Sequence, residues 1–247
     1  MNREVRNTMT LRALIFDVDG TLANTERDGH RPAFNAAFRE AGLDWHWDEA
    51  FYGTLLNVTG GLERIRHYAS HHDRKTFERP DFEEFTHRLH ESKCVIYQRL
   101  LAAGAIPLRS DIGQTICNAR TEGLRLAIAS SSAEQNIVCL LRANLGPTAE
   151  TWFDVIASGE KVTTKKPAPD VYLWTLDQLQ LPAHDCLAVE DSEHGLAAAM
   201  AAGIPTVITV SDYTREEDFE GARMILTGSE SLTLQRLRMW HDTAGQL

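Results

Sequence analysis

The sequence predicts an α/β fold in which a doubly wound, largely parallel sheet is interrupted by an inserted helical domain. Short apolar runs of strand length alternate with segments of helical periodicity, a pattern that is typical of such sheets. The runs occupy residues 13–18, 125–131, 153–158, 186–191, 205–210 and 223–227. They are mostly continuous rather than alternating, as expected for strands that are covered on both faces. Residues 25–101 contain no comparable run, so we place the helical domain there.

The helical domain is predicted from the spacing of its apolar residues. In "HRPAFNAAFREAGL" the side chains of Ala33, Phe34, Ala37, Phe38 and Ala41 fall on one face of a helix. A chain of 247 residues is long enough for one sizeable core together with a smaller insertion. We therefore predict a core formed by residues 1–24 and 102–247, and a helical domain formed by residues 25–101.

The composition of the chain excludes several classes of protein. The chain carries 25 Lys and Arg against 35 Asp and Glu, and its net charge of −10 offers no general attraction for nucleic acid. The leader "MNREVRNTMT" lacks the apolar segment of a signal peptide, and no stretch approaches the length of a membrane span. Cys94, Cys117, Cys139 and Cys186 lie far apart, which indicates reduced thiols rather than a zinc or redox site. We expect a cytoplasmic enzyme with neither nucleic acid nor a membrane as its partner.

The first predicted strand ends in two carboxylates. "LRALIFDVDGTLANTE" places Asp17 and Asp19 at the end of a buried run, and Gly20 lets the chain leave the strand tightly. In open α/β sheets, chemistry collects at the carboxyl ends of the strands. One carboxylate could attack phosphorus as a nucleophile, and the other could act as acid and base. A surface turn with a structural Asp-Gly pair is the alternative.

Two further strand ends carry groups that suit a phosphate. "ASSS" ends in Ser130, Ser131 and Ser132, whose hydroxyls and backbone N–H groups could bind an anion, although serine could also simply cap a helix. "TTKKPAPDVY" contains Lys165 and Lys166. The ammonium of Lys166 could neutralise a carboxylate and a phosphate oxygen together, whereas most lysine pairs are exposed on loops.

The fourth strand end, "VEDSEHG", supplies Glu190 and Asp191. Carboxylate oxygens are suitable ligands for Mg²⁺, although Asp191 or Ser192 could instead cap the following helix. Taken together, the four strand ends provide a nucleophile, an acid and base, a hydroxyl, a cation and metal ligands. A shared Mg²⁺ would offset the repulsion between Asp17 and Asp191.

These motifs resemble those of the haloacid dehalogenase superfamily of phosphohydrolases. "DVDGT", "ASSS", "KKPAPD" and "VEDS" match its four motifs over residues 11–210, and the helical insertion resembles the cap domain of the branch that contains β-phosphoglucomutase and phosphoglycolate-type phosphatases. The resemblance implies that Asp17 is the nucleophile, that Asp19 is the acid and base, and that Ser130 and Lys166 hold the phosphoryl group. It implies a Mg²⁺ site formed by Asp17, the backbone carbonyl of Asp19, Glu190 and Asp191.

The cap resembles that of CbbY-type proteins, which are xylulose-1,5-bisphosphate phosphatases that remove an inhibitor of Rubisco in the Calvin cycle. "TERDGHRPAFNAAFREAGLDWHWD" and "YGTLLNVTGGLERI" carry this resemblance. The substrate-binding residues predicted on this basis, together with two neighbours of the catalytic residues, are Glu26, His30, Arg31, Tyr52, Thr59, Gly60, Gly61, Arg64, Ser131 and Lys165. Trp45 and Trp47 are interpreted as packing residues of the cap.

The residue at one position of the cap leaves the identity of the substrate open. "TGG" before a helix offers backbone N–H groups for a second phosphate, but Leu62 stands where the resemblance implies a basic residue. Arg64 or Arg66 could supply the missing charge, or the substrate could carry a single phosphate. A β-phosphoglucomutase-like mutase, a broad sugar-monophosphate phosphatase and a non-catalytic scaffold are the alternatives. A small phosphorylated sugar is the expected partner, and a monomer is the expected state.

Overall fold

The computed structural model describes residues 10–58, 60–228 and 231–242. The predicted substrate residue Thr59 and the leader residues 1–9 lie outside the described residues. The chain divides into two compact units, which we call the sheet unit (residues 1–24 and 107–247) and the helical unit (residues 25–106). The second passage between the units follows Ile106, whose side chain packs against Gly29 within the helical unit.

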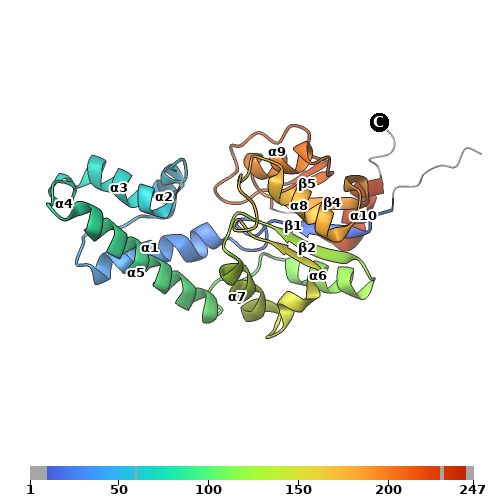
Figure 1. Ribbon diagram of the computed structural model, residues 1–247, viewed down its shortest axis with the longest axis horizontal. Helices are drawn as coiled ribbons and strands as arrows, with labels where there is room; N and C mark the ends of the chain where they lie inside the picture. Colours follow the sequence, from blue (N-terminus) through green and yellow to red (C-terminus); the bar gives the residue numbers. More distant parts are fainter. Residues whose placement is uncertain (1–9, 59, 229–230, 243–247) are drawn as a thin grey trace, which may run out of the picture. The chain divides into compact units, whose positions relative to one another are not determined.

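The sheet unit contains the six predicted strands. They are β1 (Ala13–Phe16), β2 (Arg125–Ala129), β3 (Val155–Ala157), β4 (Cys186–Glu190), β5 (Thr206–Thr209) and β6 (Met224–Leu226). All neighbouring pairs are parallel, and the order in the sheet is β3-β2-β1-β4-β5-β6. The chain therefore builds outward from β1 in one direction and from β4 in the other, which confirms the predicted doubly wound class (Figure 1).

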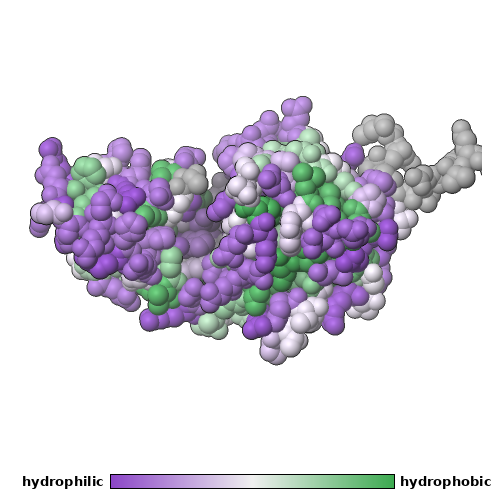
Figure 2. All heavy atoms as spheres, viewed as in Figure 1, coloured by the Kyte–Doolittle hydropathy of each residue, from purple (hydrophilic) through white to green (hydrophobic). Residues whose placement is uncertain are grey.

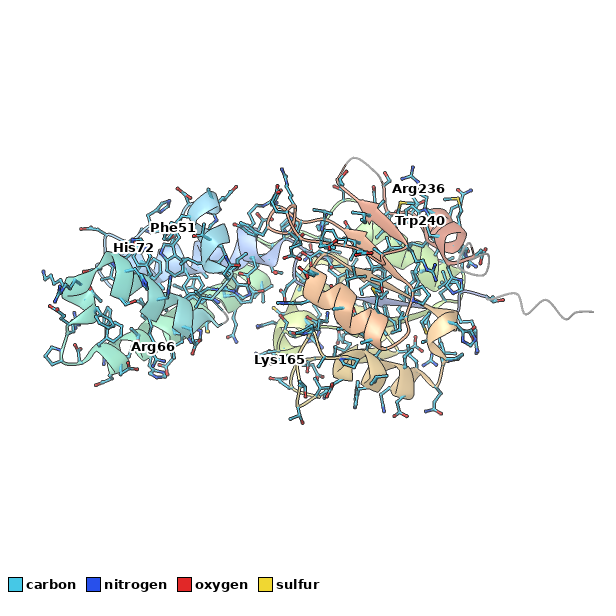
Figure 3. The ribbon with its side chains drawn as sticks, turned by 90° about the horizontal axis from the view of Figure 1, so that it is seen from above. Phe51, Arg66, His72, Lys165, Arg236 and Trp240 are labelled. Carbon is cyan, nitrogen blue, oxygen red and sulfur yellow. The ribbon has the colours of Figure 1, made fainter. Side chains whose placement is uncertain are left out.

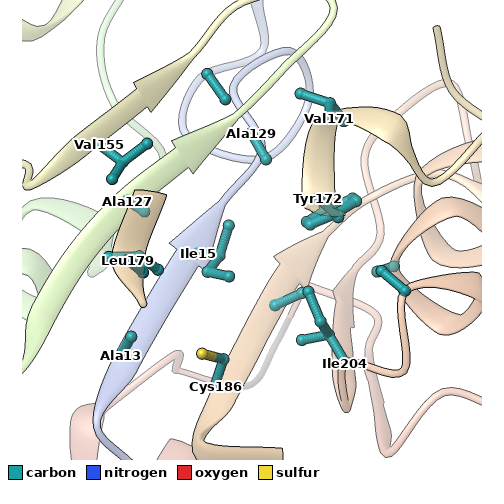
Figure 4. Close-up of a cluster of buried hydrophobic side chains, with 14 of the residues drawn as sticks. Ala13, Ile15, Ala127, Ala129, Val155, Val171, Tyr172, Leu179, Cys186 and Ile204 are labelled. Carbon is teal, nitrogen blue, oxygen red and sulfur yellow. The ribbon is translucent and has the colours of Figure 1, made fainter. Parts of the chain in front are cut away.

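Helices cover both faces of this sheet. They are α6 (Ile112–Thr121), α7 (Glu134–Leu145), α8 (Asp170–Leu179), α9 (Glu193–Ala201) and α10 (Leu234–Asp242), with the short turns η2 (Ala149–Trp152) and η3 (Ala183–Asp185). Figure 1 shows α8 and α9 on one face and α6 and α7 on the other. Under α8, the side chains of Ile15, Ala127 and Tyr172 pack in one buried cluster (Figure 4). Burial on both faces explains why the strands are continuously apolar.

The helical unit consists of η1 (Glu26–His30), α1 (Arg31–Glu40), α2 (Glu49–Leu55), α3 (Gly61–His72), α4 (Arg74–Phe77) and α5 (Phe82–Ala102). Its core is aromatic, because Trp47 lies 4.8 Å from Phe34 and 4.7 Å from Phe38 between ring centroids. Trp45 and Trp47 are buried, as predicted for packing residues. Ala41 is exposed, contrary to its predicted place on the apolar face, because α1 ends at Glu40.

The helical unit has a largely hydrophilic face (Figure 2), and the four cysteines are free thiols. On the face shown in Figure 2, side chains over the helical unit are mostly hydrophilic. None of the four cysteines forms a disulfide. Among the described residues, the structure contains no helix that combines the length and the apolar character needed to cross a membrane.

Candidate active site

The register of the sheet brings the predicted strand ends to one level. Phe16 of β1 is paired with Ile128 of β2 and with Val189 of β4. The residues that follow at the carboxyl ends, Asp17 and Glu190, are therefore neighbours. Since β1 and β4 lie on either side of the point where the strand order reverses, this is where ligands bind in open α/β sheets.

Lys166 joins two carboxylates at these strand ends. Its Nζ donates to Oδ1 of Asp17 at 2.6 Å, to Oε1 of Glu190 at 2.5 Å and to the carbonyl of Ala129 at 2.8 Å. The side chain of Lys166 is only 8% exposed, whereas the adjacent Lys165 is exposed (Figure 3). The two interpretations of the lysine pair therefore hold for different residues. Lys165 is exposed on the loop, whereas Lys166 is a buried cation.

Asp191 completes a buried group of acidic side chains. Ligand atoms of Asp17, Glu190 and Asp191 all lie within 4.8 Å of one another, and each residue is buried. The hydroxyl of Ser192 caps α9 by accepting from the N–H of Gly195 at 3.1 Å. Asp191 therefore does not perform the alternative role of helix cap, and its carboxylate faces the other two.

The serine-rich strand end also does not act as a helix cap. Helix α7 is preceded by Ala133, which makes no capping bond, whereas the hydroxyl of Ser132 donates to Oδ2 of Asp19. Ser130 is buried and its Oγ accepts from the N–H of Ser132 at 3.2 Å, while Ser131 is exposed. Ser132 thus contacts Asp19, the predicted acid and base. The sequence did not indicate this contact.

Burial controls the electrostatics of the acidic group. It raises the pKa of Asp17 to about 8, against the opposing effect of Lys166 and with the support of Glu190 and Asp19. Burial likewise raises the pKa of Asp191 well above its usual value, and Asp17 and Glu190 raise it further, whereas Ser211 and Arg109 lower it. The pKa of Lys166 is raised because Asp17 and Glu190 outweigh the effect of burial.

This charge balance fits a divalent cation. Three buried carboxylates face a single buried ammonium, so that ionisation of all three leaves negative charge in a region that water does not stabilise. A bound divalent cation supplies the missing positive charge, and carboxylate oxygens are the ligands that hard cations prefer. The cluster is therefore a candidate metal centre by its chemistry.

Tyr172 binds the same oxygen of Glu190 as Lys166 does. Its hydroxyl donates to Oε1 of Glu190 at 2.6 Å, and its ring lies 5.1 Å from Nζ of Lys166. Burial, followed by the charges of Glu190 and Asp17, raises the pKa of Tyr172, so the hydroxyl stays protonated and remains a donor. The sequence offers one signal for this role of Tyr172, which is its position near the start of α8, just beyond the "KKPAPD" motif.

Replacement of Tyr172 by Phe is expected to lower stability, because Glu190 loses a hydrogen-bond donor inside the protein. We expect the free energy of unfolding to fall by about 1.5–3 kcal/mol, as for a hydrogen bond to a charged group. Urea unfolding of both proteins in EDTA measures this change, and equal unfolding midpoints with equal slopes would contradict it.

Three of the predicted substrate residues in the helical unit contact one another. The hydroxyl of Tyr52 donates to Oε2 of Glu26 at 2.5 Å, and Nη1 of Arg64 lies 3.4 Å from Oε1 of Glu26 and 3.1 Å from the Tyr52 hydroxyl. Arg64 also donates to the carbonyl of Val58 at 3.0 Å. Its positive charge is thus shared with Glu26. Arg66 pairs with Glu83.

The remaining predicted residues of the helical unit have further partners. Gly60 contacts one of these three, since its carbonyl accepts from the N–H of Arg64 at 3.0 Å. Gly60 precedes α3 with a φ of 101°, and the Glu63 carboxylate packs against it. Gly61 lies beside His90 and Phe34. Arg31 pairs with Glu49 at 3.1 Å.

His30 has a partner that sequence reasoning missed. Its Nδ1 lies 2.7 Å from Nζ of Lys93, a buried lysine of α5, and its ring stacks on Tyr97 at 3.9 Å. Lys93 lies 4.7 Å from the centre of the Phe34 ring. The sequence around Lys93 is that of an ordinary amphipathic helix, so only the packing of η1 against α5 reveals this pair.

Comparison with known proteins agrees with this geometry. A model of the haloacid dehalogenase-like hydrolases matches residues 11–203, and the chain belongs to this family. The plasmid protein CbbY of Cupriavidus necator is 47% identical over 216 residues, which cover 87% of this chain and 85% of that protein. Protein CbbY of Rhodobacter capsulatus is 46% identical over 214 residues, with 87% and 92% covered.

A solved structure is similar over nearly the whole chain. It is a mutant of CbbY from Rhodobacter sphaeroides in complex with xylulose-(1,5)bisphosphate. It is 40% identical, covers 92% of this chain and 99% of its own, and superposes with a TM-score of 0.77. Fold and sequence thus agree in placing this chain among the hydrolases that resemble CbbY.

Proposed function

We propose that this protein is a Mg²⁺-dependent phosphatase that hydrolyses xylulose-1,5-bisphosphate through an aspartyl phosphate on Asp17. The observation that carries the proposal is the buried contact of Lys166 with Asp17 and Glu190, beside Asp191 and at the carboxyl ends of β1 and β4. Such a site pairs a nucleophilic carboxylate with a fixed cation, as phosphoryl transfer requires.

The reaction divides between two carboxylates. Asp17 attacks phosphorus in line and the bond to the sugar oxygen breaks, while Asp19 gives its proton to that oxygen. Asp19 then accepts a proton from the water that cleaves the aspartyl phosphate, which releases phosphate and restores Asp17. The Ser132 hydroxyl bound to Asp19 orients this second carboxylate.

The remaining residues stabilise charge on the transferred group. Lys166 keeps its proton and faces the nucleophile, and Ser130 donates to a phosphoryl oxygen. Asp17, the main-chain carbonyl of Asp19, Glu190 and Asp191 would hold Mg²⁺. Bound Mg²⁺ supplies positive charge for the phosphoryl oxygens and for the carboxylates.

The choice of sugar rests on the helical unit. We propose that residues 25–101 act as a cap domain whose residues select the substrate, with Glu26, Tyr52 and Arg64 as one contact group and His30 as another. The 40% identity to the CbbY that was solved with xylulose-(1,5)bisphosphate supports this substrate. Two neighbours described as β-phosphoglucomutases are 24% and 20% identical, and this likeness concerns the fold alone.

A panel of sugar mono- and bisphosphates tests the substrate. We expect kcat/KM for xylulose-1,5-bisphosphate to exceed that for β-glucose-1-phosphate by about 100-fold or more, since paired polar groups in a site discriminate strongly. Phosphate release is measured with Mg²⁺ and with EDTA, and Asp17→Asn prepared in parallel controls for contaminating phosphatases.

Three outcomes of this panel would count against the proposal. Equal or reversed preference would reject the bisphosphate as substrate. Formation of glucose-6-phosphate without phosphate release would favour a mutase. Full activity in EDTA would reject the dependence on Mg²⁺.

A further inference from the structure

Arg109 links two strand-end segments of the sheet unit through backbone carbonyls. Its guanidinium donates to the carbonyl of Gly20 in the turn after β1, and to those of Thr209 and Val210 at the end of β5, the latter two at 2.8 Å. The N–H of Arg109 also donates to the carbonyl of Leu22 at 2.8 Å. One side chain thus joins the turn after β1 to the end of β5.

Both of these segments contact Asp191. A Cβ atom at Gly20 would lie 1.9 Å from Oδ2 of Asp191, so the carboxylate rests directly on the glycine, whose φ is 85°. Ser211, which directly follows Val210, is close enough to Asp191 to lower the pKa of its carboxyl. The segments that Arg109 holds are therefore those that reach the Asp191 carboxylate, with Gly20 in direct contact with it.

A guanidinium is suited to this task. It carries several N–H donors in one plane, and it can bind carbonyls of two separate segments at once without losing its charge. A lysine ammonium presents its donors from one nitrogen atom, whereas Arg109 uses two, Nη1 for the carbonyls of Gly20 and Thr209 and Nη2 for that of Val210.

We propose that Arg109 is a positioning residue for the metal centre, which holds Gly20 and residues 209–211 so that Asp191 is directed toward Asp17. The inference rests on the proposed Mg²⁺-dependent function. It assigns to Arg109 no contact with substrate or with the metal.

The two roles that Arg109 could play have opposite effects on Mg²⁺ affinity. The positive charge of Arg109 repels the cation, whereas its hydrogen bonds would keep Asp191 in place to bind it. Arg109 is close enough to lower the pKa of Asp191 by its charge. If charge were its only contribution, removal of this cation would strengthen Mg²⁺ binding by Coulomb attraction. If Arg109 positions Asp191, its removal weakens Mg²⁺ binding, since partners of metal ligands are worth about 10- to 100-fold in affinity.

The experiment measures Mg²⁺ binding to the full-length protein without substrate, by calorimetric titration after treatment with EDTA. Arg109→Gln is compared with wild type and with Arg125→Gln. Arg125 is a matched control, because it binds the carbonyl of Leu179 at 2.7 Å and pairs with Asp154 at 2.8 Å, but stands at the amino end of β2. We expect the Kd for Mg²⁺ to rise about 10-fold or more in Arg109→Gln and to stay within about 2-fold in Arg125→Gln.

Unchanged or tighter Mg²⁺ binding by Arg109→Gln would overturn the inference while leaving the proposed function intact. A wild type that binds no Mg²⁺ would overturn the proposed function as well. If Arg109→Gln does not fold, Arg109→Lys decides the same question, because it keeps the charge but not the planar donors. Weaker Mg²⁺ binding by this variant supports positioning, and wild-type affinity rejects it.

Discussion

Replacement of Asp17 by Asn is expected to abolish turnover and leave the fold intact. The amide cannot form the acyl phosphate, so kcat should fall by on the order of 10⁴-fold or more. The amide oxygen can still accept from Lys166, and the position is buried at the end of β1, so the packing around it is preserved. Phosphate release and circular dichroism measure the two parts, and retained hydrolysis would reject Asp17 as the nucleophile.

The same variant has a pH signature in the absence of metal. The pKa of Asp17 is raised from 3.8 to about 8, so between these values the folded protein holds a proton that the unfolded chain has released. Stability of the wild type therefore falls as the pH rises through this window, by at most about 1.4 kcal/mol per pH unit, and the loss levels off above it. Asparagine has no such proton.

The difference in Tm between Asp17→Asn and wild type in EDTA should therefore grow from pH 5 to pH 8, in favour of the variant, and then remain constant. Thermal unfolding at a series of pH values measures it. A difference that is constant over this range would show that burial does not control the protonation of Asp17.

Replacement of Lys166 by Met is expected to have the second largest effect. Without the ammonium, the buried Glu190 loses its cationic partner, and removal of one partner of a buried ion pair costs about 3–5 kcal/mol. Activity should fall by about 10³-fold at pH 7, since a fixed donor at the developing charge is lost. Urea unfolding and phosphate release with Mg²⁺ measure both effects.

A double variant separates stability from catalysis. Adding Glu190→Gln to Lys166→Met removes the uncompensated charge and keeps an acceptor for the Tyr172 hydroxyl, so stability should recover in part while activity does not. Lys165→Met is the control for stability, because its side chain is exposed. Recovery of activity in the double variant, or an equal loss of stability in Lys165→Met, would contradict this account of Lys166.

Much of the fold could be predicted from local sequence. Each strand is a short apolar run that is buried on both faces, and each run is bounded by turn or helix signals, so all six strands could be located within a few residues. The helical character of residues 31–40 followed in the same way from the spacing of Ala33, Phe34, Ala37 and Phe38. The end of α1 was harder to predict, because Ala41 continues the apolar pattern but lies beyond the helix.

Only some features of the candidate site could be predicted from local sequence. Asp17, Asp19, Glu190 and Asp191 could be singled out because each lies at or just beyond the carboxyl end of a strand, where local sequence and strand direction determine the position of the side chain. Whether Lys165 or Lys166 is buried, and whether Asp191 or Ser192 caps α9, depended on the path of the chain after the strand. Local patterns allow both answers in each case.

The partners of these residues were decided by tertiary structure alone. Arg109, Tyr172 and Lys93 come from a connecting segment and from helices, and no local pattern distinguishes them from ordinary surface or core residues. Their roles arise from contacts with residues that are distant in sequence: Gly20 for Arg109, Glu190 for Tyr172 and His30 for Lys93. Short-range periodicity and strand direction are properties of a segment, whereas burial of a charge and the identity of its partner are properties of the packed chain.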